Sequence, residues 1–155
     1  MSIRLADEPF AADCELAEFT SRLTGEGAVV SFVGIARARS SSGEEVKRLV
    51  LDHHPRLTMR SLKEIAEAAR ERFDISSLRI VHRFGTVAPG ETIVFVAAAS
   101  AHRRAAFEAA NYMMDRLKTD AVFWKREETA AGSHWIEPHD DDYAARERWS
   151  ETCPE

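Results

Sequence analysis

Residues 92–118 read TIVFVAAASAHRRAAFEAANYMMDRLK, and this stretch decides the fold class of the chain. Its first part, residues 92–99, is a continuous apolar run that predicts a buried strand. Ser100 then predicts the N-cap of a helix that runs to about Lys118. The wide apolar face of this helix comprises Ala106, Phe107, Ala110, Met113, Met114 and Leu117. A buried strand followed directly by an amphipathic helix indicates layers of helix packed on sheet.

The same two patterns recur on both sides of this stretch. Further helices are expected from an N-cap at Asp13 to about Leu23, from an N-cap at Thr58 to Phe73, and over residues 140–149. Further strands are expected at residues 3–5, 28–33, 46–52, 78–84, 121–127 and 133–137, and the run 28–33 predicts a buried strand. Because strands and helices do not follow a strict βαβ repetition, the predicted class is α+β.

The composition is that of one ordinary folded domain spanning residues 1–155. A chain of 155 residues is long enough to bury a sizeable core, and 45% of it is hydrophobic and 30% charged. The formal net charge of −5 argues against a nucleic-acid-binding protein, which usually carries a large basic surface. Any anion site must therefore be a local cluster of basic residues.

The sequence gives little support for a secreted protein, a membrane protein or a metal site. Cys14 and Cys153 are too few for a disulfide framework, and we interpret both as incidental thiols. No apolar leader segment and no long apolar run is present, so a cytosolic protein without a membrane span is expected. His53 and His54 are consecutive on a strand and point to opposite faces, so no zinc site is expected. His82 is interpreted as a core histidine.

The first candidate site is the start of the helix that follows Ser100. The first amides of a helix lack partners within it, and the helix dipole favours an anion there. The basic residues His102 and Arg103 are therefore unfavourably placed unless an anion binds beside them. The alternative is that Arg103 pairs with a nearby carboxylate and that His102 is a plain surface residue.

The second candidate site contains two lysines and an arginine. Lys125 lies in an apolar strand beside Trp124, and both burial and a nearby positive charge would lower the pKa of its ammonium group. A lysine with a lowered pKa can act as a base or nucleophile. Lys118 could complete this site or simply complement the helix dipole, and Lys125 could instead pair with Glu127 or Glu128. Arg37, just past the apolar strand, is a binding candidate or a solvated loop residue.

Taken together, these segments resemble the large subunit of molybdopterin synthase. The matching motifs are GAVVSFVG at 27–34 followed by Arg37, HRFG at 82–85, PGE at 89–91, SAHR at 100–103, AFEA at 106–109, LK at 117–118, FWKRE at 123–127, and residues 132–137 with Trp135. They occur in order over residues 27–137. Each motif is weak alone, whereas the ordered set is specific to the family.

The resemblance implies a fold, a substrate and partners. The fold would be an α/β hammerhead core with an additional small antiparallel β-subdomain. The enzyme would be a homodimer within a heterotetramer, flanked by two ubiquitin-like small subunits that each carry a C-terminal glycine thiocarboxylate. Two sulfurs would be transferred to cyclic pyranopterin monophosphate, giving molybdopterin, and no metal or other cofactor would be needed.

The resemblance also assigns roles to individual residues. Lys118 and Lys125 correspond to the catalytic lysines, and Lys125 is expected to matter most. The substrate-binding residues are expected to be Ile35, Ala36, Arg37, His102, Arg103, Lys118, Lys125, Arg126 and Glu127. Two alternatives remain at this point. One is a non-catalytic module that docks a ubiquitin-like protein, and the other is a nucleic-acid binder using Arg37, Arg39, Arg103 and Arg104.

Overall fold

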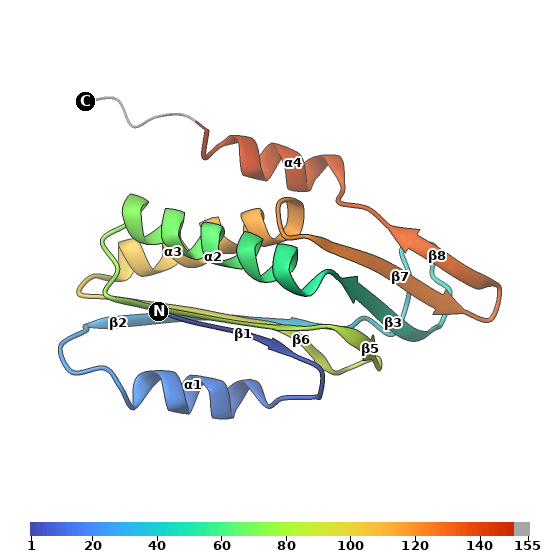
Figure 1. The fold of residues 1–155 in the computed structure, drawn as a ribbon, viewed down its shortest axis with the longest axis horizontal. Coiled ribbons are helices and arrows are strands. Elements are labelled where there is room, and N and C mark those ends of the chain that lie inside the picture. The colour runs from blue at the N-terminus through green and yellow to red at the C-terminus, as the bar shows by residue number, and fades with distance from the viewer. Residues whose placement is uncertain (151–155) are drawn as a thin grey trace.

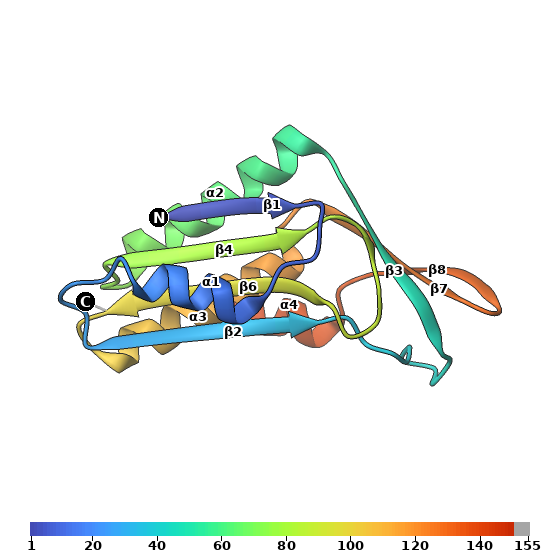
Figure 2. The same cartoon turned by 90° about the horizontal axis from the view of Figure 1, so that it is seen from below.

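The computed structural model describes residues 1–150 as two four-stranded sheets and four helices (Figures 1 and 2). The strands are β1 (Ser2–Ala6), β2 (Ala28–Ile35), β3 (Val46–His53), β4 (Ser77–Arg83), β5 (Gly85–Val87), β6 (Thr92–Ser100), β7 (Phe123–Thr129) and β8 (Gly132–Ile136). The helices are α1 (Ala12–Thr20), α2 (Pro55–Arg72), α3 (Arg103–Thr119) and α4 (Asp140–Glu147). This mixture of antiparallel and parallel pairing confirms the predicted α+β class. Within the described residues, no helix combines the length and apolar character needed to cross a membrane.

The first sheet has the strand order β1-β4-β6-β2, with β1 and β4 parallel and the other pairs antiparallel. Helix α1 covers one face, and α2 and α3 cover the other (Figure 1). The central strands β4 and β6 are therefore buried on both faces. On the α2–α3 side, fully buried residues such as Leu62, Ile80 and Met113 form the largest core cluster. This scaffold fixes where α3 begins and ends.

The second sheet has the order β5-β3-β7-β8 and is antiparallel throughout. It projects from one end of the first sheet (Figure 1). Leu49 and Leu51 of β3 pack with Val87 and Ala36 in a small apolar cluster of their own. The last helix, α4, packs along α3. Just after α4, the Trp149 ring contacts the ring of Tyr112 in α3 and that of Phe73 at the end of α2.

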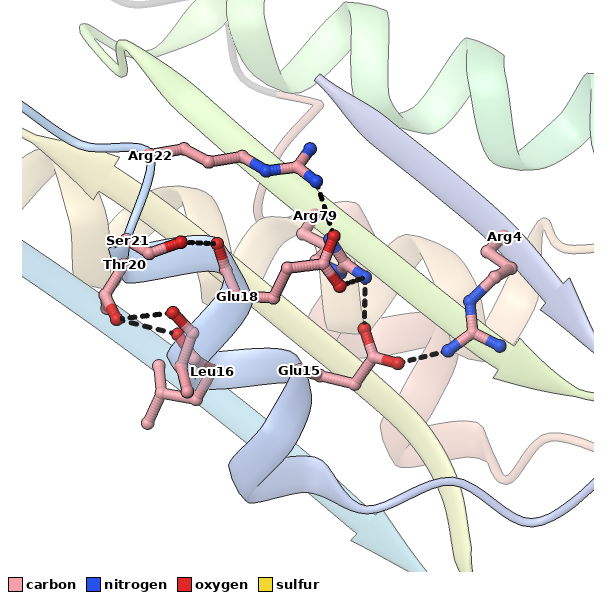
Figure 3. A network of polar contacts seen from close by, with 9 residues as sticks. Arg4, Glu15, Leu16, Glu18, Thr20, Ser21, Arg22 and Arg79 are labelled. Atoms are coloured by element: carbon pink, nitrogen blue, oxygen red, sulfur yellow. Dashed lines mark hydrogen bonds and ion pairs between the residues drawn. The ribbon is translucent and has the colours of Figure 1, made fainter.

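A network of ion pairs attaches α1 to the other face of the first sheet (Figure 3). Arg79 of β4 lies 2.5 Å from a carboxylate oxygen of Glu15 and 2.8 Å from one of Glu18. Arg4 of β1 also pairs with Glu15, and Arg22 pairs with Glu18 at 2.5 Å. Since Arg79 and Glu15 are both buried, each charge depends on the other for compensation.

Three helices begin at residues other than the predicted N-caps. The N-cap of α1 is Ala11 rather than Asp13, and that helix ends at Thr20 rather than near Leu23. The N-cap of α2 is His54, whose side chain accepts a hydrogen bond from the amide of Leu57. Thr58 lies inside this helix instead. The N-cap of α3 is His102, because Ser100 completes β6 and its hydroxyl donates to the carbonyl of Asp74 at 2.7 Å.

Two predictions of burial are wrong. Strand β2 is an edge strand rather than a buried one, and the Phe32 side chain is 42% exposed. Phe107 was expected on the core face of α3, yet it is 61% exposed. Both residues instead line a groove between β2, α3 and α4.

Candidate active site

Lys125 lies in the middle of β7, between Leu51 of β3 and Ile136 of β8. Residues directly opposite each other on neighbouring strands share a face of the sheet, so the half-buried lysine side chain is on an apolar face. Burial lowers the pKa of the Lys125 ammonium group, the positive charge of Lys118 lowers it further, and the carboxylate of Asp142 opposes both effects. The predicted perturbation of this lysine is thus present. No ion pair joins Lys125 to Glu127 or Glu128 within residues 1–150.

Lys118 lies in the last turn of α3, where its positive charge complements the helix dipole. Its side chain is half exposed, and its Nζ atom lies 3.4 Å from Oδ1 of Asp142 in α4. The same charge acts on Lys125. The structure therefore brings the two predicted lysines together, although they belong to a helix and a strand of different layers.

His82 of β4 is buried, as predicted for a core histidine. Its ring stacks on that of Phe123, with 4.1 Å between the ring centroids. Burial lowers the pKa of His82 to about 4, its hydrogen bond with the carbonyl of Arg83 opposes this, and the charge of Lys125 lowers it further. His82 is therefore neutral near pH 7.

A groove of about 500 Å³ leads to Lys118. Its lining residues come from β2, α3, α4 and the segment just after α4. They are Val30, Ser31, Phe32, Phe107, Glu108, Ala110, Asn111, Met114, Asp115, Lys118, Asp142 and Trp149. Mostly apolar walls that carry a few charged groups are typical of sites for small molecules or peptide segments.

Ile35, Ala36 and Arg37 lie at the end of β2. Ala36 is buried, and its amide donates to the carbonyl of Glu91 at 2.9 Å while its carbonyl accepts from the amide of Gly90 at 2.9 Å. Ile35 and Arg37 are exposed on either side of it. The turn at Gly90 thus fixes the backbone from which Arg37 projects.

Arg126 and Glu127 follow Lys125 on β7 but do not face the same way. Successive strand residues alternate between faces, so Glu127 shares the face of Lys125 and Arg126 lies on the opposite one. There the Arg126 guanidinium is 5.7 Å from the centre of the Trp135 ring and 3.6 Å from a carboxylate oxygen of Glu128. Within one chain, Arg126 therefore does not join the lysine pair.

His102 and Arg103 occupy the first positions of α3 and are both exposed. In residues 1–150, Arg103 forms no ion pair, so the expected alternative of a local carboxylate partner is not found. At about 1.5 Å of rise per residue, the start of α3 lies roughly 22 Å from Lys118. One chain therefore keeps the lysine pair apart from His102 and Arg103.

Three residues that line the groove are not predicted from the sequence as site residues. Phe32 and Phe107 looked like core residues because an apolar side chain gives no sign of whether a groove or a core covers it. Asp142 is the third, and its position beside Lys118 depends on how α4 packs on α3. No group of three or more His, Cys, Asp or Glu side chains able to hold a metal occurs among the described residues.

The chain matches known proteins over most of its length. The family model described as MoaE protein matches residues 5–120. The molybdopterin synthase catalytic subunit of Pseudomonas aeruginosa is 46% identical over 151 residues, which are 97% of this chain and 100% of that protein. A solved molybdopterin biosynthesis MoaE protein from Burkholderia ambifaria has a TM-score of 0.81 and 36% identity, covering 97% of this chain and 99% of that one.

A crystal structure of molybdopterin synthase from Staphylococcus aureus is also similar, with a TM-score of 0.76 and 26% identity over 85% of this chain and 94% of that one. The 46% identity over 97% of the chain and the match of the family model to residues 5–120 show the family. The chain belongs to the MoaE protein family, the family of molybdopterin synthase catalytic subunits, and is an enzyme of molybdenum cofactor biosynthesis.

Proposed function

We propose that this enzyme transfers sulfur from the C-terminal glycine thiocarboxylate of a ubiquitin-like small subunit to cyclic pyranopterin monophosphate, and that two transfers give molybdopterin. The observation that carries this proposal is the half-buried Lys125 beside Lys118 at the end of an apolar groove. A lysine whose pKa is lowered can exchange protons at physiological pH, as the displacement of an acyl group requires.

We assign different roles to the two lysines because their surroundings differ. Once the sulfur is bonded to the pterin, water attacks the acyl carbon and Lys125, on an apolar face, takes a proton from that water. Lys125 returns the proton to the sulfur as the acyl C–S bond breaks, which leaves the small subunit with a C-terminal carboxylate. Lys118, which is more exposed and paired with Asp142, supplies positive charge to the oxyanion that develops on the acyl carbon. The groove beside them would hold the extended end of the small subunit.

Arg37, His102 and Arg103 hold the phosphate of the substrate in this proposal, which makes the attack of sulfur effectively intramolecular. The start of α3 is roughly 22 Å from Lys118 in one chain, too far for one small substrate to bridge. A homodimer resolves this difficulty if the helix start of one copy lies beside the lysines of the other.

The edge strand β2 supports a second copy at this position. Its side chains Val33 and Ile35 are exposed and do not line the groove. An edge strand with exposed apolar residues usually has a partner, because unpaired strand edges otherwise promote aggregation. The strand also extends from the end of α3 near His102 to the end near Lys118, so a copy docked along it reaches both groups.

The names of the relatives support the proposal that this chain binds a small subunit. A protein named a catalytic subunit is one part of an assembly, and we infer that the assembly of this chain is a heterotetramer of two large and two small subunits in the cytosol. We further propose that the first sheet with its helices is the hammerhead core and that the second sheet is the small β-subdomain. Ile35, Ala36, Arg126 and Glu127 would complete the substrate-binding residues.

A reconstituted turnover assay tests the proposal. It combines the chain, a thiocarboxylated small subunit and cyclic pyranopterin monophosphate, and it compares wild type with Lys125→Ala. Lys63→Ala is the matched control, because Lys63 is an exposed lysine of α2. Product is expected from wild type and Lys63→Ala, with a loss of about 100-fold or more for Lys125→Ala. Binding of the small subunit without any product, even from wild type, would instead favour a docking module.

A further inference from the structure

Asp142 holds two groups at once. It lies in the first turn of α4, where its Oδ2 atom accepts a hydrogen bond from the backbone amide of His139 at 3.0 Å. Its Oδ1 atom lies 3.4 Å from Nζ of Lys118, and the Asp142 side chain is only 19% exposed. Because the helix start fixes one oxygen, the other is presented to Lys118 in a defined direction.

Two further ion pairs fix the packing of α4 on α3. In both, the arginine belongs to the end of α4 and the carboxylate to the end of α3, the reverse of the pair between Lys118 and Asp142. Arg148, just after α4, lies 2.6 Å from Asp115 of α3, and Arg146 lies 2.7 Å from Asp120. Between these two acidic residues α3 carries Lys118, which meets the acidic start of α4. This alternation of charge favours a single alignment of the two segments, and that alignment places the Asp142 carboxylate against Lys118.

A general effect of acidic residues on the helix dipole does not explain this contact. Asp140 and Asp141 occupy the same first turn and interact with the same dipole. Among the described residues, neither forms an ion pair, whereas Asp142 does. All three aspartates of the first turn therefore interact favourably with the helix dipole, and Asp142 alone among them also lines the groove.

We propose that Asp142 is a positioning residue of the sulfur-transfer site, which holds the Lys118 ammonium group at the end of the groove and sets the charge that Lys125 faces. This inference rests on the proposed function of the two lysines. Lys125 faces Lys118 from α3, Asp142 from α4 and the neutral ring of His82 from β4. Its strand neighbours Leu51 and Ile136 are apolar.

The charge of Asp142 has a defined effect on Lys125. It raises the pKa of Lys125, against burial and against the charge of Lys118, which both lower it. Loss of this carboxylate would therefore lower the pKa of Lys125 further and would also release Lys118 from its fixed place. The first effect shows in titration, and the second shows in turnover.

Asp142→Asn is the informative variant, because asparagine keeps the size and can still accept the hydrogen bond from the amide of His139. Asp141→Asn is its matched control, with the same loss of charge in the same helical turn. The first readout is the pH at which Lys125 reacts half-maximally with acetic anhydride, followed by mass spectrometry of its peptide. The second is kcat in the reconstituted assay.

We expect the half-reaction pH of Lys125 to move down in Asp142→Asn and kcat to fall between about 10-fold and 100-fold, with both unchanged in Asp141→Asn. Equal behaviour of the two variants in both readouts would overturn the proposal. If Asp142→Asn does not fold, Asp142→Glu and Asp142→Gln form a second pair of equal size, and only the charged variant should resemble wild type. Should wild type give no product at all, the proposed function fails, while the labelling of Lys125 still decides the role of Asp142.

Discussion

The His82 ring lies flat against that of Phe123, with an angle of 20° between the two planes and 4.1 Å between their centroids. This contact joins the central strand β4 of the first sheet to the first residue of β7 in the second sheet. Lys125 is two residues further along β7, so a neutral, buried imidazole helps to place the strand that carries it. Burial of this ring disfavours its protonated form.

The pH dependence of stability follows from this burial. The pKa of His82 is lowered from 6.5 to about 4, so the unfolded chain takes up a proton between these values and the folded chain does not. Stability is therefore complete above pH 6.5 and is lost as the pH falls toward 4. At about 1.4 kcal/mol for each pH unit, the loss from this residue approaches roughly 3 kcal/mol.

Urea unfolding at pH 7.5 and pH 5 measures this loss. His82→Gln removes the titrating group, so the free energy of unfolding of that variant should change less between the two pH values than that of wild type. His102→Gln, at an exposed position, should retain the wild-type difference. An identical pH dependence in wild type and His82→Gln would mean that His82 is not held neutral.

The sequence predicted β6 and the helix after it well, because both patterns are local. It misplaced the start of α3, since the Ser100 hydroxyl bonds to the carbonyl of Asp74, a residue 26 positions earlier in the chain. It misplaced the start of α2 for the same reason, since the Thr58 hydroxyl donates to the carbonyl of Val122 at 2.6 Å. A capping residue and a residue that ties two distant segments together look alike in one sequence.

The candidate site was predicted in the same uneven way. Lys125 could be recognised as perturbed because its apolar neighbours are adjacent in the chain. The edge position of β2 could not be predicted, because an apolar run looks the same in a central strand as in an edge strand whose apolar side chains are exposed. The separation of Arg103 from Lys118 follows from the length of α3 alone, and the predicted extent of that helix already implied it.

The buried ion pair of Arg79 and Glu15 should dominate the attachment of α1 (Figure 3). Arg79→Met leaves the buried Glu15 carboxylate with Arg4 alone, and we expect the free energy of unfolding to fall by about 3–5 kcal/mol. Arg22→Met removes an exposed arginine from the same network and should cost less than about 1 kcal/mol. Equal costs for the two variants in urea unfolding would contradict this assignment.

Gly27 should tolerate no side chain. A Cβ atom there would lie 2.6 Å from the carbonyl oxygen of Ala101, a backbone atom just before α3. Gly27→Ala must shift the helix start that carries His102, and we expect a loss of about 1–3 kcal/mol in thermal or urea unfolding. Gly25→Ala has no atom within 4 Å of the new Cβ and should change stability by less than about 0.5 kcal/mol. An unchanged stability in Gly27→Ala would show that the backbone at Ala101 shifts without cost.

Lys125→Arg separates the charge of this residue from its ability to lose a proton. Arginine stays protonated at all accessible pH values, so this variant cannot serve as a base. We expect turnover to fall by about 100-fold or more, whereas Lys63→Arg should behave as wild type. In wild type, turnover should rise with pH as Lys125 loses its proton, and the lowered pKa places this rise below pH 10.5. Wild-type turnover in Lys125→Arg would move the proton transfer to another group.

Mixed dimers test whether the two groups of site residues come from different copies. Lys125→Ala and Arg103→Ala should each be inactive alone. When the two variants are unfolded together and refolded, about half of the dimers should contain one copy of each. If the lysines of one copy act with the helix start of the other, one of the two sites in such a dimer is intact, and about a quarter of wild-type activity should return.

The matched control is a mixture of Lys118→Ala and Lys125→Ala. Both lysines lie in the same group of one chain, where the charge of Lys118 acts directly on Lys125. Every site in that mixture lacks one lysine, so refolding should restore nothing. Recovery in both mixtures would point to exchange of whole elements between copies, and recovery in neither would place the complete site within one chain. Recovery only with Arg103→Ala requires that an arginine roughly 22 Å from Lys118 in its own chain acts on the lysines of the neighbouring one.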